Sequence, residues 1–337
     1  MRMQPNPKGQ ALFVRLDRIG DLVLTLPVDQ RLGYQTVHWW IPQGLSFVTK
    51  SALPIRNATE IPKSIKPTRF LSLLKEVRSR KYSTAVVFHA PWWVGLLLWL
   101  AGIPVRVGVR SQWHSFLFFN RGVRQKRSRA EYSELEYNYR LVEEGLGLTS
   151  GSVPRDSLKL KAGTAALEKF GLLKGGYTVI HPGMSGSALN WPTERYEEMI
   201  RKCLAIEPVV ITGTASDEKF LAPLRERLSN EVGLHWLDRK LSGTELLEIL
   251  GNASGIVAPS TGVLHLAAST GRPTIGIYSP VRVQKAKRWG PQGERVSSIE
   301  PEVNCPGELS CLQESCPNFG CMGRISVDAA LEKLRNI

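Results

Sequence analysis

The sequence alternates short apolar runs with amphipathic stretches, and this alternation constrains the fold more than any other feature. In the first half, ALFVRL, TVHWWI and TAVVFH are typical of buried parallel strands. These runs span residues 11–16, 36–41 and 84–89, and a helical pattern at 68–82 precedes the third. Strands that alternate with helices predict a doubly wound parallel sheet of the α/β class.

The same alternation restarts in the second half. Four apolar runs end in Gly, Pro or Ser and predict strands at 177–183, 208–213, 255–260 and 273–280. Helical patterns separate them at 193–204, 217–229, 243–251 and 262–270. The segment 147–157 is rich in Gly, Ser and Pro and has no hydrophobic period, so it predicts a boundary. We therefore expect two α/β domains, residues 1–155 and 156–337.

The first residues and the longest apolar stretch bear on location. MRMQPNPKGQ is polar and lacks the features of a signal peptide, so we expect a cytoplasmic protein. PWWVGLLLWLAGIPV, at residues 91–105, is shorter than the ~20 residues that a membrane-spanning helix needs. This stretch predicts either a core helix or an interfacial one.

The formal net charge of +14 predicts attraction to a polyanion: nucleic acid, an anionic membrane face or a phosphorylated substrate. Between Arg106 and Arg129 there is no acidic residue, and aromatic side chains alternate with basic ones. The basic residues between these two are Arg110, Arg121, Arg124, Lys126 and Arg127. This combination suits docking on anionic lipid. A core helix followed by a solvated basic loop explains it equally well, and an RNA groove is a third option that no RNA-binding signature accompanies.

Candidate functional residues follow the predicted strands. Parallel sheets bind ligands beyond the carboxyl ends of their strands, so two such domains predict a site in the cleft between them. Asp21, in RIGDLVLTLP, follows the first strand. HPGMSGSALNWP, TGTASDE and PSTGVLH follow strands of the second domain.

PSTGVLHLAAS combines a strand end with a helix start. Ser260 and Thr261 are good N-caps, Gly262 follows, and His265 lies four residues after Thr261 on the same helix face. The free N–H groups and the dipole of such a helix start suit a phosphate. The alternative is a capped helix that packs on the sheet, with His265 hydrogen-bonded to a neighbour.

Five ordered motifs resemble glycosyltransferase family 9, the heptosyltransferases of the lipopolysaccharide inner core. They are RIGDLVLTLP, HPG before NWP, TGTASDE, STGVLHLAASTGRPTIGIYSP and KRWGPQG, and the resemblance runs from about residue 11 to about residue 335. It implies the GT-B architecture, two facing Rossmann-like domains with the acceptor on the N-terminal one and a nucleotide-sugar donor on the C-terminal one. It also implies a terminal helix, within 325–336, that often crosses back to the first domain.

The resemblance further implies inverting, metal-independent transfer of a heptose, with ADP-heptose as the expected donor. Asp21 matches the base that removes the proton of the acceptor hydroxyl, and Arg18 or Arg15 would set its charge. Asp21 as a simple helix N-cap is the alternative. The implied acceptor is an anionic glycolipid, lipid A with core sugars, at the inner membrane, with no nucleic acid. The side chains expected to face the acceptor or membrane are Arg18, Arg110, Arg121, Arg124, Lys126 and Arg127.

On the donor side, Ser260, Thr261, Gly262 and His265 match the segment that binds the donor phosphates. Asp217 matches an acid used near the ribose, and Ser185 and Ser187 lie where the family contacts the diphosphate.

Two positions depart from the family pattern. Ser260 stands where the family usually has an aspartate, and Leu189 lies in ALN, where a basic residue usually precedes WP. Arg195, Lys285 or Arg288 would have to supply the missing cation. A nucleotide-sugar or glycan binding protein on the same scaffold is therefore the alternative to an enzyme.

Four cysteines, Cys305, Cys311, Cys316 and Cys321, lie close together near the C-terminus, and Cys203 lies alone on a predicted helix. Their spacing lacks the paired C-x-x-C arrangement of common zinc sites, and a reducing compartment disfavours disulfides. Similar tails occur in relatives, which implies a structural role. A zinc or cluster site remains the alternative.

Overall fold

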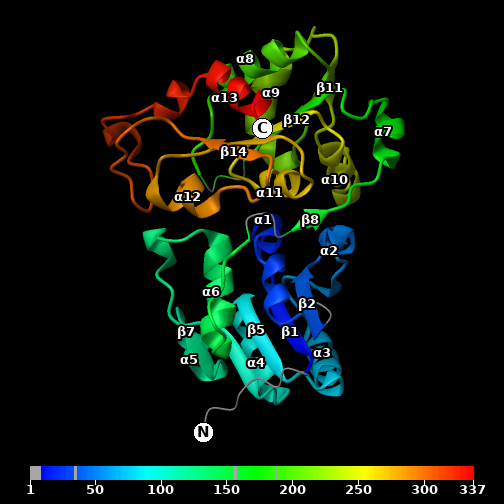
Figure 1. Cartoon of the computed structure of the whole chain (residues 1–337), viewed down its shortest axis with the longest axis vertical. Coiled ribbons are helices and arrows are strands. Elements are labelled where there is room, and N and C mark those ends of the chain that lie inside the picture. Colours follow the sequence, from blue (N-terminus) through cyan, green and yellow to red (C-terminus); the bar gives the residue numbers. More distant parts are fainter. Residues whose placement is uncertain (1–8, 34–35, 155–157, 185, 187) are drawn as a thin grey trace. The chain divides into compact units, whose positions relative to one another are not determined.

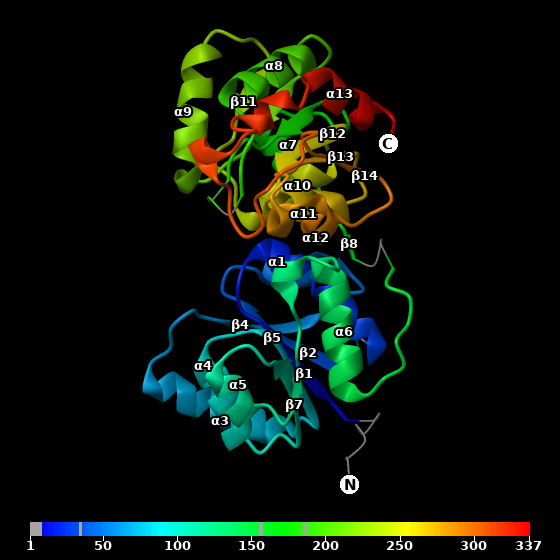
Figure 2. The ribbon, with the colours of Figure 1, turned by 90° about the vertical axis from the view of Figure 1, so that its left-hand side faces the viewer.

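The computed structural model describes residues 9–33, 36–154, 158–184, 186 and 188–337. The chain divides into two compact units, residues 1–127 with 134–154 and residues 128–133 with 155–337. In each unit, helices pack around a parallel sheet (Figures 1 and 2). Every helix in the described part of the chain is too short or too polar to cross a membrane.

The first unit contains a six-stranded sheet in the order β4-β2-β1-β5-β6-β7, with every neighbouring pair parallel. Its strands are β1 (Ala11–Arg15), β2 (Val37–Pro42), β3 (Ala52–Leu53), β4 (Asn57–Ile61), β5 (Thr84–His89), β6 (Val105–Val109) and β7 (Arg121–Val123). Its helices are α1 (Ile19–Val23), the 3₁₀ helix η1 (Leu26–Arg31), α2 (Ser46–Ser51), α3 (Pro67–Arg80), α4 (Trp92–Leu100), α5 (Trp113–Phe118) and α6 (Glu134–Leu146).

The central strand β1 is buried along its whole length, as expected for a parallel strand covered on both faces. Leu12 and Val14 join a core cluster that contains side chains of α3 and α4. Because successive side chains of a strand point to opposite faces, Phe13 and Arg15 lie on the other face. Helix α6 packs against β5, β6 and β7.

The second unit contains a six-stranded sheet in the order β11-β10-β9-β12-β13-β14, again with parallel neighbours. Its strands are β8 (Lys159–Leu160), β9 (Thr178–Ile180), β10 (Val209–Ile211), β11 (Leu234–Trp236), β12 (Gly255–Pro259), β13 (Thr274–Ile277) and β14 (Val296–Ile299). Its α-helices are α7 (Ala165–Phe170), α8 (Thr193–Leu204), α9 (Glu218–Arg227), α10 (Gly243–Gly251), α11 (Gly262–Ser269), α12 (Ala286–Trp289) and α13 (Val327–Arg335).

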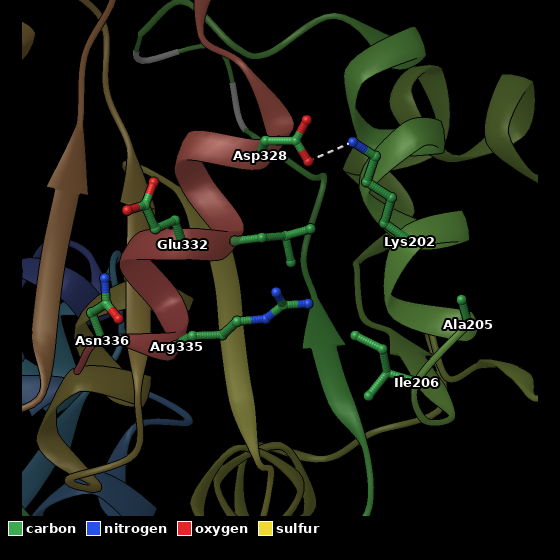
Figure 3. Close-up of a pocket in the computed structure, with 8 residues that line it drawn as sticks. Lys202, Ala205, Ile206, Asp328, Glu332, Arg335 and Asn336 are labelled. Carbon is green, nitrogen blue, oxygen red and sulfur yellow. Dashed lines mark hydrogen bonds and ion pairs between the residues drawn. The ribbon is translucent and has the colours of Figure 1, made fainter.

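The C-terminal helix α13 packs within this unit, against α8, β13 and β14. Val327, Ala330 and Leu331 join the core cluster that α8 and α9 also line. Figure 3 shows a shallow groove between α8 and α13, where Lys202 Nζ lies 2.6 Å from Asp328 Oδ1. The exposed ion pair and the buried apolar face together hold the end of the chain on its own sheet.

Numbered along the chain, the six strands of each sheet follow the order 3-2-1-4-5-6 of a Rossmann-like fold, which confirms the predicted α/β class. The strand order reverses between β1 and β5 in the first unit and between β9 and β12 in the second. Ligands of such sheets bind beside the carboxyl ends of the strands at this reversal. The loops after these four strands are therefore where functional side chains are expected.

Candidate functional site

Asp21 lies in the short helix α1, directly after the loop that follows β1, and is bound by a buried arginine. Arg15, the last residue of β1, is 3% exposed. Its Nη2 donates to Asp21 Oδ1 at 2.6 Å, and its Nε donates to Asp17 Oδ1 at 2.7 Å. One guanidinium therefore binds and orients two carboxylates at the end of the central strand.

Helix α6 completes this cluster from a distant part of the sequence. Arg15 Nη1 lies 3.5 Å from Glu134 Oε1 and 3.4 Å from Asn138 Oδ1. Asn138 Nδ2 in turn donates to Thr25 Oγ1 at 3.0 Å, and Thr25 Oγ1 donates to the Asp21 carbonyl at 2.6 Å. Asp21 is thus held through its side chain by Arg15 and through its backbone by Thr25.

The charges around Asp21 shift its titration. Burial raises the pKa of Asp21 to about 6; the Arg15 guanidinium opposes this rise, and the carboxylates of Asp17 and Glu134 add to it. Burial lowers the pKa of Arg15, but the neighbouring carboxylates outweigh it and the net shift is upward, so Arg15 stays a cation. Asp21 is consequently a carboxylate at pH 7 that accepts a proton more readily than an exposed aspartate does.

Sequence reasoning anticipated Arg15 as a partner of Asp21, but not Asp17, Glu134 or Asn138. A local signal for the last two exists, because they lie four residues apart and occupy the buried face of an amphipathic helix. Polar side chains on such a face need partners. Their spacing, however, does not say which strand supplies the partner.

In the second unit, helix α11 begins directly after β12, as predicted. Thr261 is the N-cap residue, yet its side chain makes no capping hydrogen bond. Thr261 Oγ1 and His265 Nδ1 are buried and have no hydrogen-bond partner within the described residues. Burial lowers the pKa of His265 to about 4, so its imidazole is neutral at pH 7. Two buried polar atoms without partners at a helix start indicate a place for a polar ligand.

The segment after β13 packs beside Ser260. The Tyr278 hydroxyl interacts with the Ser260 side chain and donates to the Trp289 carbonyl. Ala286 and Trp289 of α12 pack against Leu264 of α11 in a small apolar cluster that also contains Tyr278. Lys285, at the start of α12, therefore lies in a segment that is anchored next to the start of α11.

Of the three cations considered as replacements on the donor side, Arg195 is already bound. Its Nε and Nη2 donate to the Gly323 carbonyl at 3.1 and 2.9 Å, and its Nη1 pairs with Glu198 at 2.9 Å. The Arg288 guanidinium lies over the Trp289 ring, 4.7 Å from its centre. The Lys285 ammonium has no hydrogen bond or ion pair with any residue that the structure describes.

Asp217 ends the short 3₁₀ turn Ala215–Asp217 that follows β10, and its side chain is 4% exposed. It forms a capping box with Thr214. Its Oδ2 accepts from Thr214 N at 2.8 Å and from Thr214 Oγ1 at 2.7 Å. A side chain at Gly183 would meet the Asp217 carboxylate at 2.3 Å, so only glycine lets the loop after β9 pass this close. Ser185 and Ser187, predicted in that loop, lie outside the described residues.

The basic segment separates into bound and exposed side chains. Arg127 donates to Glu134 and, at 3.3 Å, to Asn138, so it belongs to the cluster around Arg15. Arg106 donates to backbone carbonyls, among them that of Phe118 at 2.7 Å. Arg18, Arg124 and Lys126 are exposed, whereas Arg110 and Arg121 are half-buried.

Within the apolar stretch at 91–105, residues Trp92–Leu100 form α4, which has a buried face and an exposed one. Val94, Leu97 and Leu98 are buried in the core, while Trp92 and Trp99 are about half exposed, at 52% and 51%. Helix α5 packs against α4 and exposes Trp113, Phe116 and Leu117. We call the exposed side chains the α4–α5 surface: Trp92, Trp99, Leu100, Trp113, Phe116 and Leu117.

Cations border the α4–α5 surface. The Arg110 guanidinium lies over the Phe116 ring, 5.4 Å from its centre. Arg78 is exposed and donates to the Leu100 carbonyl at 2.9 Å. Exposed aromatic rings with adjacent arginines are a combination that suits a membrane interface.

Within the described residues, no three His, Cys, Asp or Glu side chains are already arranged around a single point as ligands of one metal ion. Asp17, Asp21 and Glu134 each form an ion pair with Arg15. The strand reversal of the first unit carries a carboxylate paired with an arginine. That of the second unit carries uncharged polar groups, and the segment that contains Lys285 packs next to them.

Several known proteins are similar to this chain in sequence or in structure. A Haemophilus influenzae protein with an unproven glycosyltransferase assignment is 27% identical over 341 residues, 96% of this chain and 95% of that protein. Lipopolysaccharide heptosyltransferase 2 of Escherichia coli K12 is 25% identical over 217 residues, 60% of this chain and 62% of that protein. The structure of E. coli ADP-heptose lps heptosyltransferase II is 19% identical, covers 97% of this chain and 98% of its own, and has a TM-score of 0.77.

The model of glycosyltransferase family 9 (heptosyltransferase) matches residues 70–315, well over half of the sequence. The chain is therefore a glycosyltransferase with the GT-B fold, and it belongs to glycosyltransferase family 9.

Proposed function

We propose that this protein is an inverting glycosyltransferase that moves a heptose from ADP-heptose to a lipopolysaccharide core acceptor. The observation that carries the proposal is Asp21, a carboxylate held by Arg15 at the end of β1 with its pKa raised to about 6. A general base is most effective when its pKa lies near the working pH.

In the proposed reaction, Asp21 accepts the proton of an acceptor hydroxyl as that oxygen attacks the anomeric carbon. The new carbon–oxygen bond forms on the face opposite the diphosphate, and the bond to the diphosphate oxygen breaks. Arg15 keeps the carboxylate oriented, since Asp17 and Glu134 hold the guanidinium from other sides. The proton remains on Asp21 until it passes to solvent.

The leaving nucleoside diphosphate gains charge, which preorganised donors must stabilise. We assign this role to the start of α11 with Thr261 and His265, and to Lys285 as the nearby cation. In this proposal protein groups, and no metal, stabilise the diphosphate. Asp217 is placed next to the loop after β9 by its capping box, which agrees with a position near the ribose.

We further propose that the protein works at the cytoplasmic face of the inner membrane as a peripheral protein. The E. coli relative is named a lipopolysaccharide heptosyltransferase, and lipid-linked substrates are held at a membrane. The α4–α5 surface, with Arg78 and Arg110 beside it, would dock on anionic lipid headgroups.

A second candidate is a binding protein that recognises a nucleotide sugar without transferring it. Ser260 and Leu189, at positions where the family usually carries charge, favour this candidate. A thermal-shift panel of ADP, UDP, GDP and ADP-heptose followed by a transfer assay separates the two, because binding raises the melting temperature by mass action. Binding without transfer to any lipopolysaccharide acceptor supports the second candidate.

Asp21→Asn tests the assigned base. The variant keeps the size of the side chain but cannot accept the proton, so we expect kcat to fall by ~10²–10⁴ with unchanged affinity for ADP. Asp17→Asn is the matched control, because it removes a second carboxylate bound to the same guanidinium and should leave transfer measurable. Near wild-type turnover by Asp21→Asn would contradict the assignment.

The pH profile gives an independent test. Because the base must be deprotonated, we expect kcat/KM to rise with pH along an acid limb with an apparent pKa of about 6. Asp17→Asn removes a negative charge that raises this pKa, so the limb moves to lower pH. A profile that is flat across roughly pH 5 to 7 in the wild-type protein argues against Asp21 as the base.

Lys285→Ala tests the donor-side cation. A hydrogen bond to a charged group contributes about 1.5–3 kcal/mol, so we expect the affinity for ADP to fall by at least roughly tenfold. Arg195→Ala removes a cation that is bound to Gly323 and Glu198, and the affinity for ADP should stay within about twofold of wild type. Calorimetric titration measures both, and the reverse order of the two losses overturns the assignment.

The α4–α5 surface is tested by a combined variant, Trp113→Ser with Phe116→Ser and Leu117→Ser. These side chains are 68%, 52% and 64% exposed, so the fold should persist. Since burying each is worth about 1.5–3 kcal/mol, co-sedimentation with anionic vesicles should fall more than tenfold. Leu173→Ser, at a 78% exposed position of the second unit, is the control and should sediment like wild type. If the wild-type protein binds neutral and anionic vesicles equally well, Arg78 and Arg110 do not contribute to membrane binding through anionic headgroups.

A further inference from the structure

Four of the five cysteines line a single cavity in the second unit. The cavity measures about 200 Å³ and is lined by Cys305, Cys311, Cys316 and Cys321. All four are free thiols; Cys321 is buried and the other three are half-buried. The remaining wall is mostly apolar and includes Leu189, Pro192, Leu312, Phe319 and Met322.

Backbone amides point at two of the sulfurs. Gln313 N donates to Cys311 Sγ at 3.3 Å, and Asn318 N donates to Cys316 Sγ at 3.4 Å. In each case the amide two residues after the cysteine donates to it. Hydrogen bonds of this kind stabilise a sulfur that carries negative charge, and they are a recurrent feature around metal-bound thiolates.

The four thiols are also close enough to influence one another. Cys305, Cys311 and Cys316 each interact electrostatically with Cys321, and Arg324 lies nearby. Four sulfurs at the wall of one small cavity are a ligand set that zinc or iron takes in proteins.

We propose that Cys305, Cys311, Cys316 and Cys321 form a four-thiolate centre for a thiophilic metal, zinc or iron, that is structural and separate from sugar transfer. Binding releases the thiol protons to solvent and forms four metal–sulfur bonds, with no change of oxidation state. The sulfurs surround the cavity without yet converging on one point, so binding requires side-chain rotations that draw them inward. Such a centre takes sulfur ligands at about 2.3 Å from zinc.

The centre would fix a segment that has little regular structure of its own. Between β14 and α13 the structure contains only the one-turn 3₁₀ helices η6 (Gln313–Ser315) and η7 (Cys321–Arg324) among the described elements. Trp191 Nε1 donates to the Ile325 carbonyl at 3.2 Å, which joins this segment to the residues before α8. Leu189 lines the cavity and follows the loop after β9. A bound metal would thus stabilise the segment between β14 and α13, which packs against the end of the loop after β9.

The test is metal content of the full chain, purified under reducing conditions without chelator. Elemental analysis should find about one zinc or iron per chain, and cobalt substitution should give the strong absorption of tetrahedral thiolate coordination. Inorganic sulfide together with iron identifies a cluster, and iron without sulfide identifies a single ion; both support the centre.

Cys316→Ser and Cys311→Ser should each lose the metal and lower the melting temperature, whereas Cys203→Ala should keep it. Cys203 is the matched control because it is buried in α8 outside the cavity. Four thiols that all react with a thiol reagent before and after chelation, disulfides in the reduced preparation, or full metal content in Cys316→Ser would each overturn the proposal. Wild-type metal content and the cobalt spectrum decide the matter even if the serine variants fail to fold.

Discussion

The buried guanidinium of Arg15 is the interaction on which the site of the first unit depends. A charge at the end of a central strand is costly to bury unless it is paired, and here Asp17, Asp21 and Glu134 pair with it from α1 and its preceding loop and from α6. The same contacts place three carboxylates together. Their mutual repulsion, added to burial, brings the pKa of Asp21 toward neutrality. The pairing that stabilises the arginine therefore also brings the pKa of Asp21 into the range that its proposed role as a base needs.

The two units use one topology for different chemistry. Both reverse their strand order beside the first strand, so in each the loop after that strand is available to a ligand. In the first unit this loop is filled by an ion cluster. In the second, the helix that begins after the neighbouring strand β12 has buried polar atoms of Thr261 and His265 without described partners. A neutral imidazole and backbone N–H groups suit an anion, because they donate hydrogen bonds without competing carboxylates.

Local pattern predicted much of this fold. Helices α8 and α10 begin and end where their 3.6-residue periods do, and Ser242 with Glu245 forms the capping box at the start of α10. Strands β4 and β11 were beyond such reasoning, because neither is a continuous buried apolar run and pairing with a neighbour is what makes them strands. The position of Asp21 beyond the carboxyl end of β1 was predictable, because the apolar run before it indicates a strand. Its contact with α6 was not, since Arg15 and Glu134 lie 119 residues apart.

Arg195 connects the region before α8 to the C-terminal segment through its hydrogen bonds to Gly323. A basic residue is usual just before WP in this family, and here Leu189 faces the cysteine-lined cavity instead. Arg195, the next basic residue along the chain, binds Gly323, two residues after Cys321. Both side chains therefore contact the cysteine segment, and in the proposed reaction the segment after β13 supplies the cation for the diphosphate. If Lys285 takes over that charge, donor binding and the anchoring of the C-terminal segment can vary independently, because different residues carry them.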